Sequence, residues 1–136
     1  MISTVDFINQ CNTQFETGGL GSLSEDEKTV CLINLVDFEV SMGGLAGFYN
    51  NSSGDYTSEA VFALEKVGAF VVATALRDSA SLFGTAELLR NREHRQDLLP
   101  TVSVTLRAYE QFYYTQIPTL SELTNSYVQR ILSLRG

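Results

Sequence analysis

Residues 24–40 read SEDEKTVCLINLVDFEV, which begins with a helix-capping signal and continues as an almost unbroken apolar run. Ser24 and Glu27 have the spacing of a capping box, in which each side chain accepts a hydrogen bond from the other residue's backbone N–H. The acidic side chains of the first turn also favour the positive end of the helix dipole. From Val30 to Val40 only three residues are polar, so apolar side chains surround the helix axis almost completely. We therefore predict a central, buried helix.

Helical patterns also flank this central stretch. Upstream, apolar residues three or four positions apart predict a helix that is capped by Ser3 with Asp6 and ended by the glycine-rich connector 17–22. Downstream, Gly43 and Gly44 predict the end of the central helix, because two glycines permit the left-handed backbone geometry of a helix end. Further helices are expected over about 57–66, 69–83, 86–99, 103–116 and from 118 onward.

Polar residues and prolines set the expected boundaries after the central helix. Asp55 is expected to be the N-cap of the helix that follows a turn over 45–54. Pro100 is expected to end one helix, because proline removes a backbone donor, and Thr119 with Glu122 is expected to form a second capping box. No alternating strand pattern of useful length and no internal repeat occurs. The sequence thus predicts an all-α fold, a single-domain bundle of six to seven helices over residues 1–136.

The length of 136 residues is typical of one domain, whose core needs neither disulfides nor a metal. No run of 18 or more apolar residues occurs, and the N-terminus lacks the basic start and apolar centre of a secretion signal. Cys11 and Cys31 both occupy apolar positions of helical patterns, so we expect free, buried thiols. We expect a cytoplasmic protein that does not contact a membrane.

The net charge of −7 is distributed unevenly along the chain. Residues 1–68 contain ten acidic residues and two lysines, whereas residues 69–136 contain six acidic residues and seven arginines. The whole negative excess therefore belongs to the first half of the sequence. An acidic field of this kind repels nucleic acid and membrane phosphates and attracts basic proteins. It also favours solubility.

Catalytic and metal-binding patterns are largely missing from the sequence. His94 is the single histidine, and with two distant cysteines it cannot complete a zinc site, so we expect a solvated helix residue. No glycine-rich segment follows a strand or carries the lysine of a phosphate loop. Asp37 and Glu39 lie about 200° apart around their helix, so they cannot converge on one substrate atom. We expect a protein that is not an enzyme and that uses no cofactor or metal.

Two polar features stand out from this background. Glu39 is a carboxylate near the end of an apolar helix, where burial is costly unless the group is hydrogen-bonded. We therefore expect Glu39 to be largely buried and bonded to the segment 43–55. The run NNSSGD at 50–55 consists of turn formers, whose side chains cap backbone groups. We expect this run to be a structural connector.

An aromatic cluster near residue 112 is the third such feature. Tyr109, Phe112 and Tyr113 share one helix face, which is more typical of a core than of a contact surface. Tyr114 points elsewhere and is a candidate exposed anchor for a partner. Three nearby arginines are expected either to form a solvated face or to contact acidic residues of the first half: Arg90, Arg92 and Arg95.

The sequence from Leu23 to Ala69 resembles the signature of the DNA-mimic-like domain-of-unknown-function family, which comprises acidic, all-helical bacterial proteins. The signature includes an acidic helix that ends in Glu-Val, a glycine pair, an aromatic pair, an Asn-x-Ser-Gly-Asp segment and a helix that closes in Gly-Ala. The matching residues are Glu39, Val40, Gly43, Gly44, Phe48, Tyr49, Asn50, Ser53, Gly54, Asp55, Gly68 and Ala69. The runs 95–98 and 110–113 resemble later helices of the family, so the resemblance spans residues 23 to about 113.

The resemblance implies an acidic helical protein that imitates the phosphate charge of DNA and inhibits a DNA-binding protein such as a transcription factor. The resemblance is also compatible with a homodimer. The sequence departs from the family pattern at three positions. Ser41 and Met42 replace two asparagines and have no side-chain amide to make the same contacts, and Ala108 replaces an aspartate.

We therefore predict that carboxylates of the first half engage lysines and arginines of a basic partner through charge-assisted contacts. The candidates are Glu25, Asp26, Glu27, Asp37, Asp55, Glu59 and Glu65. The partner would be a DNA-binding protein or, if the chain is an immunity protein, a toxin. The alternative of another class is a small-molecule or enzymatic site around Glu39, Asn50 and Asp55. A broad acidic face would favour the first hypothesis, and a deep pocket of mixed polarity would favour the last.

Overall fold

The computed structural model describes residues 2–135, and within this range the chain forms seven α-helices, three short 3-10 helices and no strand. The elements are α1 (Thr4–Gly18), η1 (Leu20–Ser22), α2 (Glu25–Asn50), η2 (Ser52–Tyr56), α3 (Thr57–Lys66), α4 (Phe70–Ala80), η3 (Ser81–Phe83), α5 (Ala86–Leu89), α6 (Arg92–Thr115) and α7 (Ile117–Arg135). The expectation of an all-α bundle is confirmed.

Helix α2 is the centre of the bundle, because α1, α3, α6 and α7 all pack against it. Its predicted capping box is present: the backbone N–H of Ser24 donates to Glu27 Oε1 at 2.8 Å, and that of Glu27 donates to Ser24 Oγ at 3.3 Å. Val30, Val36 and Val40 have no exposed surface. By length and composition α2 could cross a membrane, but its apolar side chains here form the core of the helical bundle.

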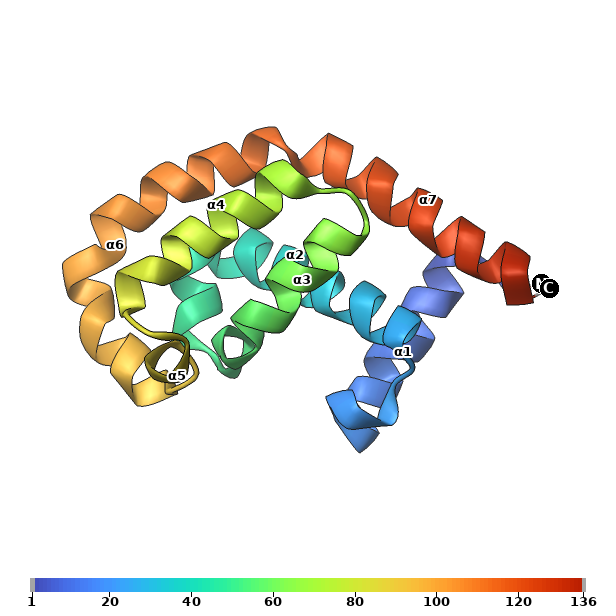
Figure 1. Ribbon diagram of the computed structural model, residues 1–136, viewed down its shortest axis with the longest axis horizontal. Coiled ribbons are helices and arrows are strands. Elements are labelled where there is room, and N and C mark those ends of the chain that lie inside the picture. Colours follow the sequence, from blue (N-terminus) through green and yellow to red (C-terminus); the bar gives the residue numbers. More distant parts are fainter. Residues whose placement is uncertain (1, 136) are drawn as a thin grey trace.

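The other helices are arranged around α2 at two ends (Figure 1). Helices α3 and α4 form an antiparallel pair, and the long helix α6 passes along α4 and α2. At the opposite end, α7 continues beyond α6 and packs against α1 and α2 (Figure 1). The core is continuous between the two ends, from Phe7 and Val128 to Phe48 and Phe83.

Helix α2 bends sharply at Gly44, whose φ of 70° and ψ of −174° are not helical. A Cβ at this position would lie 2.0 Å from Glu110 Oε1, so the α6 side chain fits only because residue 44 is glycine. The same carboxylate accepts the backbone N–H of Leu45 at 2.7 Å. The predicted helix end at Gly44 is thus a kink, and the expected turn after it is wrong, because the chain continues as helix to Asn50.

The expected boundary at Pro100 is wrong. Pro100 lies inside α6, and the break between helices falls earlier, where Asn91 caps α6 by accepting the backbone N–H of His94 at 3.0 Å. A proline inside a helix leaves the carbonyl four residues earlier without its donor. Here that residue is Gln96, which is exposed, as Pro100 is, so water can hydrate the carbonyl. The helix expected over 86–99 is therefore the four-residue α5 followed by the start of α6.

The last helix also begins earlier than predicted. The backbone N–H of Leu120 donates to the carbonyl of Gln116 at 2.9 Å, so Thr119 lies inside α7 and does not cap it. Pro118 falls in the first turn, where a missing N–H costs little. At the other end of α7, Leu134 is 90% exposed.

A fully buried arginine joins the elements at one end of the bundle. Arg95 of α6 has no exposed surface, and its guanidinium donates to the carbonyls of Tyr49, Leu89 and Asn51 at 2.5–3.0 Å. A fourth bond, 2.7 Å long, goes to Asp55 Oδ1. These acceptors belong to the end of α2, η2 and the end of α5, so one side chain fastens three segments to α6.

Cys11 and Cys31 are both free and buried, as expected. Burial raises the pKa of the Cys11 thiol to about 11 and that of Cys31 to about 12. Burial also raises the pKa of the Tyr49 hydroxyl, which shares a 2.6 Å hydrogen bond with Ser79, and that of the Tyr113 hydroxyl. All four groups therefore stay protonated in the folded chain at neutral and moderately alkaline pH.

Replacement of Arg95 by methionine should lower the free energy of unfolding by about 3 kcal/mol or more, because it leaves buried carbonyls without a donor. Urea denaturation followed by circular dichroism at 222 nm measures the change. Arg92→Met is the matched control: Arg92 is exposed and makes one bond, to the Asn50 carbonyl. It should cost less than about 1 kcal/mol. Equal effects of the two substitutions would contradict the role of Arg95.

The free energy of unfolding should fall as pH rises above about 9. In the unfolded chain thiols and phenols lose protons at about pH 8.5 and 10, whereas Cys11, Cys31, Tyr49 and Tyr113 hold theirs in the folded chain. The folded state then binds more protons, so stability decreases with pH. Urea titrations between pH 8 and 10.5 test this, and replacing both cysteines by alanine should move the onset to about pH 10.

Candidate partner-binding surface

The segment that carries the family resemblance is held together by its own side chains. Glu39 Oε2 accepts the Asn51 side-chain amide at 3.0 Å, which confirms the predicted bond to the 43–55 segment. Glu39 is half-buried, however, and the prediction of a largely buried group is wrong. Ser53 Oγ donates to the carbonyl of Phe48 at 2.8 Å. Asp55 turns to Arg95 and does not cap α3, whose N-cap is Tyr56.

The glycines and Asn50 of the family signature differ in how much the structure depends on them. Gly54 lies against Arg95, and a Cβ there would stand 2.6 Å from its Nε. Gly68 has a φ of +88°, which favours glycine between α3 and α4. The carbonyl of Asn50 accepts the side chains of Arg92 and Gln96. A Cβ on Gly43 would meet nothing within 4 Å, so the structure gives no reason for glycine at this position.

The alternative hypothesis is a small-molecule or enzymatic site around Glu39, Asn50 and Asp55. Glu39 and Asp55 are bonded to Asn51 and Arg95, and the carbonyl of Asn50 receives two side chains of α6. Clefts lie on both sides of α3, between α4 and α6, and beside α1. Glu39, Asn50 and Asp55 are not among the residues that line these clefts. Their polar groups stabilise the connection between α2 and α3, in agreement with the expected structural connector.

Four of the seven candidate partner-binding acids are in ion pairs within the chain. Glu25 pairs with Lys28 at 3.2 Å, and Asp55 pairs with Arg95 at 2.7 Å. Glu59 and Glu65, both on α3, pair with Arg90 and Arg77. Three arginines from the second half of the sequence thus neutralise acids from the first half. The separation of charge along the sequence is therefore smaller in space than in the chain.

The other three candidates, Asp26, Glu27 and Asp37, have no ion-pair partner within residues 2–135. Asp26 accepts the hydroxyl of Tyr127 at 2.9 Å, and Asp37 accepts that of Tyr113 at 3.0 Å. Both hydroxyls are neutral donors, so the carboxylates keep their charge. The capping role of Glu27 lowers its pKa, since the N–H of Ser24 bonds to its charged form. The structure thus separates candidates with neutralised charge from candidates with unneutralised charge.

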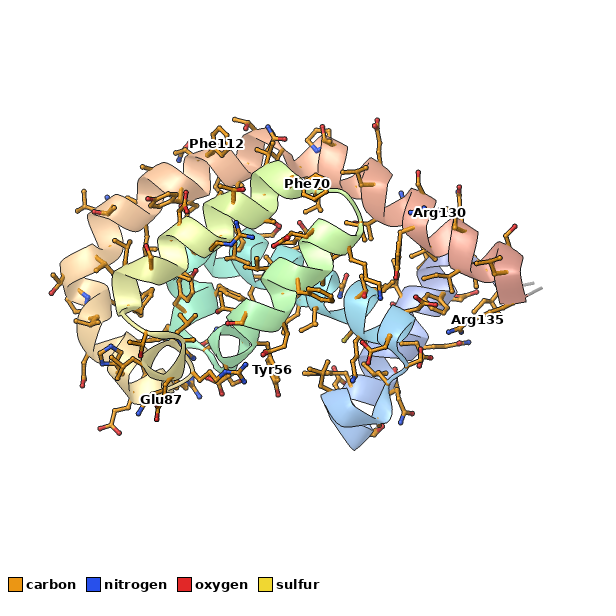
Figure 2. The ribbon with its side chains drawn as sticks, viewed as in Figure 1. Tyr56, Phe70, Glu87, Phe112, Arg130 and Arg135 are labelled. Atoms are coloured by element: carbon orange, nitrogen blue, oxygen red, sulfur yellow. The ribbon has the colours of Figure 1, made fainter. Side chains whose placement is uncertain are left out.

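The negative excess is spread over several helices. Sixteen acidic side chains less the four in ion pairs leave twelve, and nine cationic side chains less four leave five, within residues 2–135. Of the acids outside ion pairs, Glu16 lies on α1, Asp78 on α4 and Glu122 on α7. Glu87, Glu93 and Asp97 lie on α5 and the start of α6 (Glu87 in Figure 2). Net repulsion of anions is therefore a property of the whole molecule.

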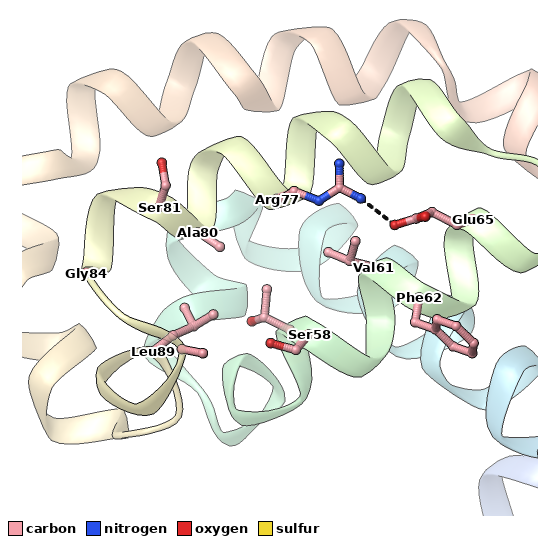
Figure 3. A pocket seen from close by; sticks show the side chains of 11 residues that line it. Ser58, Val61, Phe62, Glu65, Arg77, Ala80, Ser81, Gly84 and Leu89 are labelled. Carbon is pink, nitrogen blue, oxygen red and sulfur yellow. Dashed lines mark hydrogen bonds and ion pairs between the residues drawn. The ribbon is translucent and has the colours of Figure 1, made fainter.

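Two clefts flank α3, and both contain neutralised charges. A cleft of about 350 Å³ between α3, α4 and α5 has the Glu65–Arg77 ion pair in its wall (Figure 3). A cleft of about 340 Å³ on the other side includes Glu25, Lys28 and Glu59. Phe62, which lines both clefts and is 66% exposed, lies between them. This side of the molecule offers an aromatic contact with little net charge.

The aromatic cluster of α6 is only partly a core feature. Tyr113 is buried and Tyr109 is half-buried, as expected for that face, but Phe112 is 49% exposed. Phe112 and Phe70 line an apolar cleft of about 530 Å³ between α6 and α4 (Figure 2). Tyr114 is 37% exposed and its hydroxyl donates to the Val40 carbonyl, so its tip is fixed to α2.

Several important contacts were not expected from the sequence. His94 is half-buried, and its Nε2 lies 2.8 Å from the Phe83 carbonyl, so the expectation of a solvated residue is wrong. For Arg95 the sequence left two alternatives, a solvated face or a contact with the acidic half. The structure shows the contact, an ion pair with Asp55. Glu110 accepts a hydrogen bond from α2, and Tyr113 donates one to α2; both partners are more than 60 positions away in the sequence. Periodicity places such residues on a helix face but cannot identify partners so distant in sequence.

The comparisons agree with this structure. A fold made only of helices around one apolar centre, with an excess of unneutralised carboxylates, defines an acidic all-α protein within residues 2–135. The family model of the DMP19-like proteins matches residues 21–131, so the chain belongs to this family, which is of the DNA-mimic type. No curated protein and no solved structure matches the chain. The family resemblance of the sequence is thereby confirmed.

Replacing Glu39 or Asn51 by alanine should each lower the free energy of unfolding by about 1 kcal/mol, since their hydrogen bond is charged but half-exposed. If the bond itself is responsible, the double variant should cost about as much as either single variant. Urea denaturation of the four proteins measures the coupling. Additive losses would show that the two side chains act separately. Glu16→Ala, an exposed α1 change, should stay within about 0.5 kcal/mol.

Proposed function

We propose that the chain is a non-catalytic, acidic protein-binding module that occupies the basic surface of a DNA-binding protein, such as a transcription factor, inside the cell. The observation that carries the proposal is the excess of twelve carboxylates over five cations outside ion pairs, in a member of a DNA-mimic-type family. A protein surface that binds DNA carries lysines and arginines placed to contact phosphates. An acidic module can engage the same groups.

Electrostatic attraction between the chain and its basic partner would act in two stages. The net charge of −7 raises the rate of encounter with a basic partner at low ionic strength. Contacts are then made by carboxylates that are not already neutralised, among which Asp26, Glu27 and Asp37 of α2 belong to the predicted set. Glu25, Asp55, Glu59 and Glu65 would have to exchange an internal arginine or lysine for one of the partner. We therefore assign them a smaller part in binding.

The partner can be sought by using the purified chain as bait in a lysate of the native cells, with mass spectrometry of what is retained. We expect basic DNA-binding proteins that are released by 1 M salt and displaced by duplex DNA. Salt weakens such contacts because the Debye length falls from about 10 Å at 0.1 M to about 3 Å at 1 M. Retention at 1 M salt, or binding together with DNA, would contradict the proposal. Retention of a toxin instead would identify an immunity protein.

Neutralisation of the α2 start should slow association with the captured partner. The variant Glu25→Gln/Asp26→Asn/Glu27→Gln removes three charges and retains the capping pattern, because glutamine also serves at the third helical position. At 50 mM salt its association rate should fall several-fold more than its dissociation rate rises, since exposed charges mainly steer encounter. Surface plasmon resonance measures both rates.

The matched control for this variant is Glu87→Gln/Glu93→Gln/Asp97→Asn, which removes the same charge from α5 and the start of α6. If binding uses the start of α2, the control should slow association less than the α2 variant does. At 0.5 M salt the difference between them should nearly vanish, because the charges are screened. Equal rates for the two variants at 50 mM salt would place the contact away from the start of α2.

A further inference from the structure

A small cleft lies where α1, α2 and α7 meet, and it differs from the clefts beside α3 in its charge. Its volume is about 150 Å³. Ile8 and Leu120 contribute apolar surface, and Asn34, Ser121 and Asn125 contribute polar groups. Asp37 is the single charged residue among those that line it. The cleft therefore combines room for a long side chain with one negative charge that no lining cation neutralises.

The position of the Asp37 carboxylate is fixed from outside the cleft. The Tyr113 hydroxyl of α6 donates to Asp37 Oδ1 at 3.0 Å. Burial, together with the adjacent Asp37 carboxylate, raises the pKa of Tyr113, so this donor is retained at physiological pH. The bond orients the carboxylate without cancelling its charge, and it leaves Oδ2 available to a further donor. The clefts beside α3 lack this arrangement, because Glu25 and Glu65 there are paired with Lys28 and Arg77.

We propose that this cleft receives a lysine side chain of the basic partner, with its ammonium at Asp37 and its methylene groups against Ile8 and Leu120. The assignment rests on the proposed function and gives it a specific site. An ammonium group has three donors and no acceptor, and it meets the Asp37 carboxylate and the side-chain oxygens of Asn34, Ser121 and Asn125. Long cationic side chains commonly cover apolar surface with their stems while their heads stay in polar surroundings.

Lysine fits this cleft better than arginine. A guanidinium binds a carboxylate most strongly as a planar fork, which uses both carboxylate oxygens. In this cleft Tyr113 already occupies Oδ1 of Asp37, so the fork would have to share that oxygen. An ammonium is a compact point charge that needs only one oxygen of the carboxylate and can bond to separate acceptors around it. The geometry thus points to a lysine.

The cleft can be tested without the partner. Nα-acetyl-lysine amide is titrated into the ¹⁵N-labelled chain, and the backbone amide shifts of α2 and α7 are followed by NMR. We expect saturable, millimolar binding that moves the signals of Asn34, Asp37, Ser121 and Asn125. Nα-acetyl-norleucine amide, which has no ammonium, should bind at least about tenfold more weakly, since a charged hydrogen bond contributes about 1.5–3 kcal/mol and 1.4 kcal/mol is tenfold. Equal shifts with both compounds would overturn the proposal.

The variant Asp37→Asn keeps the shape of the side chain and an acceptor for Tyr113, so it should fold, and it should weaken lysine amide binding at least about tenfold. Glu122 lies next to Ser121 on α7 but does not line the cleft. The control variant Glu122→Gln therefore removes one nearby charge and should change binding less than twofold. Asn125→Lys, at an exposed position, supplies a competing ammonium and should abolish binding. Unchanged binding to Asp37→Asn or Asn125→Lys would refute the site.

Two further results separate the failure of this site from that of the proposed function. Tighter binding of Nα-acetyl-arginine amide than of the lysine compound would overturn the choice of lysine. If the lysine compound does not bind while a captured partner remains sensitive to salt and to duplex DNA, the cleft assignment fails and the acidic module stands. If the compound binds at Asp37 but no captured protein is displaced by DNA, the cleft is a lysine site and the proposed function fails.

Discussion

The structure depends on the burial of one guanidinium group. Arg95 is surrounded by the carbonyls of Tyr49, Leu89 and Asn51 and by the Asp55 carboxylate. Burying a cation is costly unless its donors are satisfied, so the segment around it must take the shape that presents these acceptors. This requirement explains why Gly54, which faces the guanidinium, has no room for a side chain. The path of the chain between α2 and α3 follows from this constraint.

A second anchor on the same helix has the opposite charge. Glu110 of α6 accepts the backbone N–H of Leu45 and fills the space that a side chain on Gly44 would need. Arg95 and Glu110 thus hold the two ends of the 44–55 region against α6. Much of the polar motif that resembles the DNA-mimic-type family is therefore structural. In this member of the DMP19-like family it holds the connection between α2 and α3 in place.

Ion pairing decides which carboxylates of the chain have their charge neutralised from within. Arg77, Arg90 and Arg95 come from the second half of the sequence and fold back onto acids of the first half. An acid already paired with an arginine must give up that partner before it can bind another, whereas an acid held by a tyrosine hydroxyl keeps its full charge. Asp26 and Asp37 are of the second kind. They lie on α2 at its contacts with α7 and α6.

The sequence by itself determined the helical class, the central position of α2 and its capping box, because apolar periodicity and caps act over three or four residues. It also determined the total charge and the break at Gly44. It misplaced the boundary at Pro100, which lies at an exposed position inside α6, and the start of α7, where Pro118 falls in the first turn and its missing N–H costs little. Only the tertiary structure decided that Arg95 is buried, that Glu110 receives Leu45 and that four of the seven candidate acids are neutralised. Those outcomes depend on contacts between residues far apart in the chain, which no local pattern encodes.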